Sequence, residues 1–139
     1  MVRKKAARRS RSAAGKAARR FPDAVVAAID AAKILGLRAG DKHRFIGVWV
    51  VVIEKRVFVR SWSVKPDGWF HGFRQDPCGA INITGVELAA RAVLTRSDRL
   101  KDAIDRAYLE KYDTKGSLRY ARDLCSEKSR ETTTEFVPR

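Results

Sequence analysis

The sequence predicts an α+β fold in which one mainly antiparallel sheet curls toward a barrel and helices lie against it. The expected elements come in the order helix, three strands, short helix, two strands, helices and a final strand. Strands joined by short turns, with helices gathered at the ends of the order, favour α+β over an alternating α/β fold. Residues 43–53 are apolar on both faces of a strand, so this segment belongs inside a barrel or in the middle of a sheet.

The first half of the chain predicts a helix and three strands. Asp23 directly after Pro22 is a helix start, and apolar residues recur at helical spacing through Ala32. The short apolar segments 34–40, 43–53 and 57–62 are the expected strands. The sequence between the last two lacks the Asn-Gly or Asp-Gly of a two-residue hairpin, which predicts a longer or distorted turn there.

The second half predicts a short helix, two strands, two helices and a closing strand. Trp69 and Phe73 stand at i and i+4 in the short helix, and Gly85 marks the turn between the two strands. Ser97 is a natural N-cap for the most strongly amphipathic helix of the chain, which a shorter helix follows. The β-prone residues 132–139 complete the sheet.

Most of the positive charge lies in an N-terminal tail. The chain has 139 residues and a formal net charge of +14, and residues 3–20 hold nine Lys or Arg and no acid. We therefore expect a disordered basic tail over residues 1–20 and a folded domain over 21–139. The tail is a solvated extension, a transit-like leader, or a weak and non-specific contact for nucleic acid. It contains no aromatic residue that could stack on bases.

Composition favours a cytoplasmic protein. The longest apolar run, residues 45–53, is far shorter than the roughly 20 residues that cross a bilayer. Cys78 and Cys125 are distant in sequence and belong to no CxxC pair, and two reduced thiols are the simpler alternative to a disulfide.

Familiar catalytic motifs are absent from the sequence. It holds two histidines, His43 and His71, and no G-x-S-x-G segment, metal-binding spacing or phosphate-binding glycine loop. We assign no catalytic residue and no metal ligand. The residues alone leave an enzyme and a non-catalytic binding protein both open.

One segment nevertheless combines hydrogen-bond donors, cations and indole rings. All three tryptophans fall within residues 49–69, and residues 60–69 add an arginine, serines and a lysine. Such donors suit an oxyanion, and indole rings offer flat apolar walls, so the segment suits a phosphorylated aromatic ligand. The alternative is a barrel rim with core tryptophans and solvated charges. The candidate ligand-binding residues are Arg60, Ser61, Trp62, Ser63, Lys65 and Trp69, with Lys111 as a second anion contact.

The stretches "VWVVVIEKRVFVRSW" and "AIDRAYLEKYD" carry a family resemblance. Residues 35–139 resemble an uncharacterised bacterial domain family. More distantly they are similar to deazaflavin-dependent nitroreductases and to FMN-binding split barrels of the pyridoxamine phosphate oxidase type. The resemblance implies a split β-barrel of about six strands with flanking helices, often dimeric, with the flavin on the barrel surface. It implies that the cofactor phosphate lies near Ser61, Ser63 and Lys65, beside Trp69.

Three functions follow from these observations. The first is a protein that binds FMN or a deazaflavin, with oxidoreductase chemistry of the nitroreductase or quinone reductase kind supplied by the cofactor. The second is a non-enzymatic binding or interaction protein, with the same barrel and without a cofactor. The third is nucleic-acid contact through residues 3–20.

Overall fold

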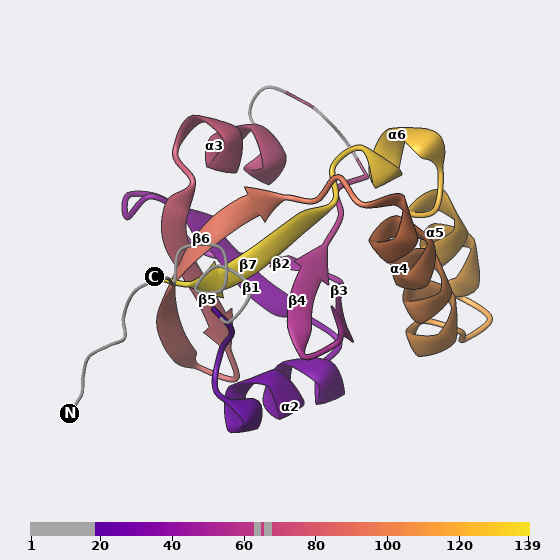
Figure 1. The fold of residues 1–139 in the computed structure, drawn as a ribbon, viewed down its shortest axis with the longest axis horizontal. Coiled ribbons are helices and arrows are strands. Elements are labelled where there is room, and N and C mark those ends of the chain that lie inside the picture. Colours follow the sequence, from indigo (N-terminus) through magenta and orange to yellow (C-terminus); the bar gives the residue numbers. More distant parts are fainter. Residues whose placement is uncertain (1–18, 63–64, 66–67) are drawn as a thin grey trace.

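Seven strands form the barrel of the computed structural model, which describes residues 19–62, 65 and 68–139 (Figure 1). The strands are β1 (Leu35–Ala39), β2 (Ile46–Val48), β3 (Val50–Ile53), β4 (Arg56–Val59), β5 (Cys78–Ile83), β6 (Val86–Leu94) and β7 (Thr134–Pro138). The helices are α2 (Asp23–Ala31), α3 (Trp69–Gln75), α4 (Asp98–Lys111), α5 (Leu118–Asp123) and α6 (Glu127–Arg130). Neighbouring strands follow the order β2-β1-β5-β6-β7-β4-β3, and every pair is antiparallel.

One bent segment brings the two ends of the sheet together. β2 and β3 are the first and last strands of the order, yet only Trp49 separates them in the sequence. β2 pairs with β1, and β3 pairs with β4, so the barrel is nearly closed at this residue. Val50 faces the barrel interior and Val51 packs outward under α4, which confirms the expectation of a segment buried on both faces.

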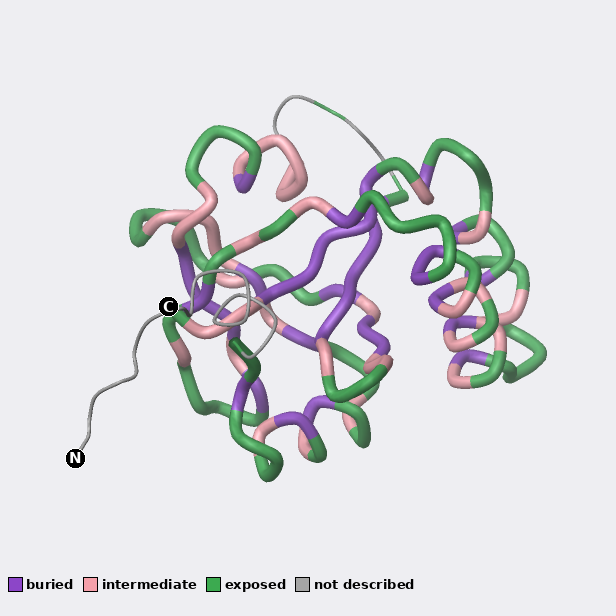
Figure 2. Tube along the Cα trace, viewed as in Figure 1, coloured by how far each residue is buried: buried purple, intermediate pink, exposed green. Residues whose placement is uncertain are grey.

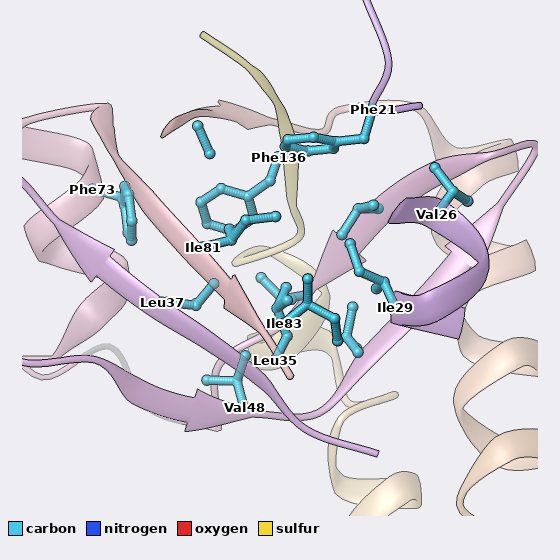
Figure 3. Packing of buried hydrophobic residues seen from close by; sticks show 14 residues of the cluster. Phe21, Val26, Ile29, Leu35, Leu37, Val48, Phe73, Ile81, Ile83 and Phe136 are labelled. Carbon is cyan, nitrogen blue, oxygen red and sulfur yellow. The ribbon is translucent and has the colours of Figure 1, made fainter. Parts of the chain in front are cut away.

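The barrel interior holds the larger hydrophobic core (Figure 3). Inward-facing strand residues such as Leu37, Ile81 and Phe136 point toward one another there. α2 covers one end of the barrel and α3 lies at the other (Figure 1). α3 contributes Phe73, whose ring lies edge-on to Phe136 with the centroids 5.0 Å apart. Phe21, the first residue of the predicted domain, is buried in this core.

A second core lies outside the barrel, between β3, β4 and the α4–α5 pair. The inner face of α4 is buried while its outer face is exposed (Figure 2). Ile104 and Tyr108 pack here with Phe58 of β4. The Ser97 hydroxyl accepts a hydrogen bond of 3.2 Å from the Leu100 N–H, which confirms the predicted N-cap.

Polar side chains of α4 satisfy the backbone where the barrel closes. The Tyr108 hydroxyl donates to the Trp49 carbonyl (3.0 Å) and accepts from the Arg60 N–H (3.1 Å). The Tyr112 hydroxyl accepts from the Val50 N–H at 3.0 Å. We call the Trp49–Val50 joint, together with the Tyr108, Lys111 and Tyr112 side chains that bind its peptide groups, the seam. Where a strand bends, some of its peptide groups lose their partners on the neighbouring strand. Peptide groups that are buried need another hydrogen-bond partner, because an unpaired one costs free energy.

The β3–β4 turn differs from its prediction. Ile53 pairs with Arg56, so the loop has two residues, Glu54 and Lys55. Both have positive φ, at 54° and 63°, which is the conformation of a type I′ hairpin. The prediction of a longer turn was wrong because the strand pairing on both sides imposes this geometry on residues that do not favour it. The β5–β6 turn at Thr84 and Gly85 also has two positive φ values, and its position was predicted correctly.

Other predictions can be compared with the structure. The split barrel is confirmed with seven strands instead of about six, because the segment 43–53 divides at Trp49. α6 was not predicted. Cys78 and Cys125 are both free. Within the described part of the chain, no helix has the length and apolarity to cross a bilayer. The cytoplasmic location stays a prediction. The predicted disordered tail spans residues 1–20, of which residues 1–18 lie outside the described residues.

Candidate functional site

Arg60, the first predicted ligand residue, lies in a buried ion-pair cluster. Its side chain has no exposed surface. The guanidinium donates to the Asp105 carboxylate, the Thr133 hydroxyl and two backbone carbonyls, those of Lys101 and Leu124. Since these partners come from α4, α5 and the segment before β7, Arg60 ties the helices to the barrel. The sequence assigned it to an anionic ligand, but this enclosure turns its donors inward.

Ser61 and Trp62 also lie at this end of β4, and they differ in exposure. Ser61 is buried, with its N–H donating to the Thr132 hydroxyl (2.8 Å). Trp62 is 42% exposed and its indole N–H donates to the Tyr120 carbonyl (3.2 Å). Its ring lies edge-on to Trp49, which stacks on Tyr112 at 4.1 Å. Ser63 lies outside the described residues.

Lys111 belongs to the seam. Its ammonium donates to the Val50 carbonyl at 2.8 Å, and to the Ile29 carbonyl at 3.4 Å. Burial lowers the pKa of Lys111, while the nearby Asp30 carboxylate opposes this effect. The sequence proposed a second anion contact for this residue, whereas in the structure its donors serve backbone carbonyls.

The remaining two predicted residues, Lys65 and Trp69, lie at the start of α3. The Gly68 N–H, which precedes the helix, donates to the Lys65 carbonyl at 2.9 Å. Lys65 is exposed, and Trp69 is half-buried against the edge of the barrel core. The predicted residues thus divide into a group at the end of β4, a pair at α3, and Lys111 in the seam.

A cavity of about 440 Å³ lies between α3 and β1, and we call it the α3 pocket. Its lining residues are Leu37, Arg38, Ala39, His43, Arg44, Ile46, Gly68, Trp69, Gly72 and Gln75. α3 lies against β1 at Gly72, where an added Cβ would lie 3.4 Å from the Ala39 Cβ, at van der Waals contact. The pocket therefore combines one indole, apolar side chains and two guanidinium groups.

Arg38 gives the α3 pocket its polar wall. One of its terminal nitrogens donates to Glu87 at 2.7 Å, and its guanidinium lies 4.5 Å from the centre of the Phe45 ring. Its Nε is buried and has no hydrogen-bond partner among the described residues. A buried donor without a partner is costly. An acceptor that reached this nitrogen would remove the cost, which makes Arg38 suited to hold an anionic ligand.

No sequence motif predicted Arg38, His43 and Arg44 as site residues. The available signal was the cluster of basic residues around the Gly40–Asp41 turn, between two predicted strands. Gly40 has a φ of +64°, which reverses the chain there and brings residues on both sides of the turn to one pocket. Among the described residues, no group of His, Cys, Asp and Glu side chains is arranged to hold a metal ion.

Comparison with protein families identifies the family of the chain. The profile of DUF2255, described as uncharacterized proteins conserved in bacteria, matches residues 22–136. The chain belongs to this family. The match covers all of the helices described above and every strand up to Phe136 in β7, and no curated protein matches the chain.

A solved structure shares the fold of this DUF2255 protein. It is a Listeria innocua protein described as a "Putative Pyridoxamine 5'-phosphate oxidase". The two are 14% identical with a TM-score of 0.57, and the match covers 84% of this chain and 91% of that chain. At this identity the likeness shows the fold alone, and it supports the split-barrel class predicted from the sequence.

Proposed function

We propose that the protein binds a flavin-type cofactor, FMN or a deazaflavin, in the α3 pocket and acts as an oxidoreductase. The observation that carries the proposal is the combination of an indole wall with two arginines in a cavity of about 440 Å³. Cavities of roughly 300–1,000 Å³ with apolar walls and a few polar groups are typical of cofactor sites. The split-barrel fold shared with the Listeria innocua protein supports the proposal.

The residues of the α3 pocket fit such a cofactor. Trp69 and Ile46 offer a flat apolar surface for a fused ring. Arg38 and Arg44 offer guanidinium groups for a phosphate, and Arg38 has an unpaired buried Nε.

A bound flavin supplies the hydride chemistry itself. The chain's own residues then have three tasks. Trp69 covers one ring face, the arginines fix the phosphate, and the open side of the pocket leaves the other face to a substrate. None of these tasks needs a protein acid or base, consistent with the lack of a recognisable catalytic motif in the sequence.

We also expect a homodimer. Ile46 is 41% exposed and lines the α3 pocket, and Ile34 is 51% exposed beside it, close to Gly47. Exposed isoleucines on a strand next to a pocket suit an interface between two copies, which would also shield the cofactor from water.

A specific observation favours a second function, a non-enzymatic interaction protein without cofactor. Trp62 and Tyr120 are 42% and 44% exposed and lie edge-on with their ring centres 6.4 Å apart. Exposed aromatic pairs are typical of protein-binding surfaces. This function predicts a colourless protein whose melting temperature does not respond to flavins.

A ligand titration tests the proposed function. The purified protein is titrated with FMN and, separately, with a deazaflavin, while melting temperature and tryptophan fluorescence are recorded. A ligand at 100 times its Kd stabilises by about 2.7 kcal/mol, which corresponds to roughly 10 °C in Tm for a domain of this size. Light scattering in the same samples gives the oligomeric state.

Matched variants locate the site. We expect Trp69→Phe and Arg44→Gln each to weaken binding by about tenfold, which is about 1.4 kcal/mol. Trp62→Phe and Arg122→Gln are the controls, because both residues lie outside the α3 pocket. If neither ligand changes Tm or fluorescence at high micromolar concentration, the function is wrong. If the controls weaken binding and the pocket variants do not, the ligand lies at the end of β4 instead.

A further inference from the structure

The largest cavity described on this protein, about 770 Å³, is lined by arginines. It lies on the outer surface of β4, β6 and β7, next to the residues that precede α2. We call it the arginine groove. Its lining residues are Arg19, Arg20, Arg56, Arg91, Val93, Glu135, Val137, Pro138 and Arg139. It shares none of them with the α3 pocket.

The strand register builds the groove. Arg91 of β6 stands opposite Val137 of β7, and Val93 stands opposite Glu135. These side chains face outward because the alternate residues, including Phe136, face the barrel core. Short valines on neighbouring strands form a low apolar floor, and the long arginines rise around it.

The side chains that line the groove carry more positive than negative charge. Five of its nine lining residues are arginines and one is acidic. Glu135 is fully used by Arg56, which donates to it at 2.9 and 3.0 Å, and this hydrogen bonding raises the pKa of Arg56. The Arg91 guanidinium donates to the Cys78 sulfur at 3.5 Å, and among the described residues it forms no ion pair with a carboxylate.

The groove also continues the basic N-terminal segment. Arg19 and Arg20 are the last two of the nine cations in residues 3–20, and both line the groove. Arg19 is anchored there, because its guanidinium donates to the Pro138 carbonyl at 3.1 Å. The start of the folded part is therefore fixed beside Arg91 and Arg139. Arg19 and Arg20 thus add two cations to those that the barrel surface contributes to the groove.

We propose that the arginine groove binds the phosphate backbone of a nucleic acid. The guanidinium groups of the groove that Glu135 does not hold suit phosphates, since a guanidinium can bind a phosphate through two hydrogen bonds. The lining contains no aromatic side chain, so bases cannot stack in it, and contact is with the backbone of a duplex, independent of sequence. This goes beyond the flavin function and uses a separate surface.

Fluorescence anisotropy with the full chain tests the groove. The probe is a labelled DNA duplex of about 20 base pairs, titrated at salt concentrations between about 50 and 200 mM. The test variant is Arg91→Gln/Arg139→Gln. The control, Arg106→Gln/Arg122→Gln, removes the same charge from the exposed surfaces of α4 and α5. Both keep the N-terminal segment intact, so only the position of the lost charge differs.

We expect the groove variant to bind at least tenfold more weakly near 50 mM salt, with a salt slope less steep by up to about 2, since each lost phosphate contact removes about 0.9. The control should change affinity less than about threefold, because distant surface charges are screened. Arg91→Lys/Arg139→Lys keeps the charge and should recover most of the slope. All variants should melt like the wild type, because both groove residues are exposed.

Three results would overturn the proposal. Equal losses in the groove and control variants would mean that total charge, not the groove, binds DNA. A mononucleotide that displaces the duplex at a similar concentration would make the groove a small-ligand pocket. A change of oligomeric state in the groove variant, with DNA binding unchanged, would mean that a second copy covers it.

Discussion

Asp105→Ala tests whether Arg60 is a structural residue. Arg60 is enclosed and its only carboxylate partner among the described residues is Asp105. Removing that carboxylate leaves a guanidinium without a counter-charge in a dry site. Uncompensated buried charges of this kind cost about 3–5 kcal/mol of folding free energy. For a domain of this size the loss corresponds to more than 10 °C in melting temperature.

The same helix supplies a matched control. Asp102 lies one turn before Asp105 and is exposed, and within the described part of the chain its one ion pair is with Arg130, at 3.1 Å. An exposed ion pair contributes about 0–1 kcal/mol, so Asp102→Ala should be close to neutral. The assay is urea unfolding at neutral pH, followed by circular dichroism, with the midpoint compared at equal slope.

Equal destabilisation by the two alanine variants would refute this reasoning. It would mean that Arg60 finds another partner or reaches water when Asp105 is lost. Arg60 would then be accessible to an anion, and the role that the sequence suggested for it would return. A large difference between the variants would keep Arg60 out of the ligand site.

Two further predictions concern the seam and the β3–β4 turn. Burial raises the pKa of Tyr112 to about 12 from a model-compound value of 10.0, and it also raises the pKa of Tyr108. The folding free energy that the neutral hydroxyls contribute is therefore complete below pH 10 and is lost progressively as the pH rises above 10. Because solvent partly screens this group, ionisation of Tyr112 should cost on the order of 1 kcal/mol or less of folding free energy between pH 9 and 11, seen as a lower urea midpoint, and Tyr112→Phe should reduce this pH dependence. Lys55→Gly should stabilise by about 0.5–1 kcal/mol in the same assay, because a φ of 63° suits glycine. Lys55→Ala should give no gain, and a gain equal to that of glycine would contradict the explanation from backbone conformation.

Most of the fold could be predicted from local patterns. Ser97 and the apolar stripe after it determine α4, and Gly85 marks the β5–β6 turn. The bend at Trp49 could not be predicted, because it depends on which strands the two halves of the segment 46–53 pair with, far away in the sequence. The two-residue turn at Glu54 and Lys55 could not be predicted for a similar reason. The pairing of β3 with β4 imposes positive φ values that these residues do not favour.

The candidate site was harder to predict than the fold. Residues 60–69 are close in sequence, but they run from the end of β4 to the start of α3, so Arg60 and Trp69 lie in different surroundings. The enclosure of Arg60 could not be predicted, because it depends on Asp105 and Leu124, which come 45 and 64 residues later. Trp69 lines the α3 pocket in the structure, but the cationic wall of that pocket comes from residues 38–44. No sequence pattern linked these residues to Trp69.

The seam ties barrel closure to helix docking. Only Trp49 joins the two ends of the sheet, and Tyr108 and Tyr112 of α4 satisfy the peptide groups on either side of that joint. If α4 detached, it would strip those groups of their partners and loosen the ring of strands at the same moment. Barrel and helix therefore cannot melt one after the other, and the protein should lose its structure in a single cooperative step.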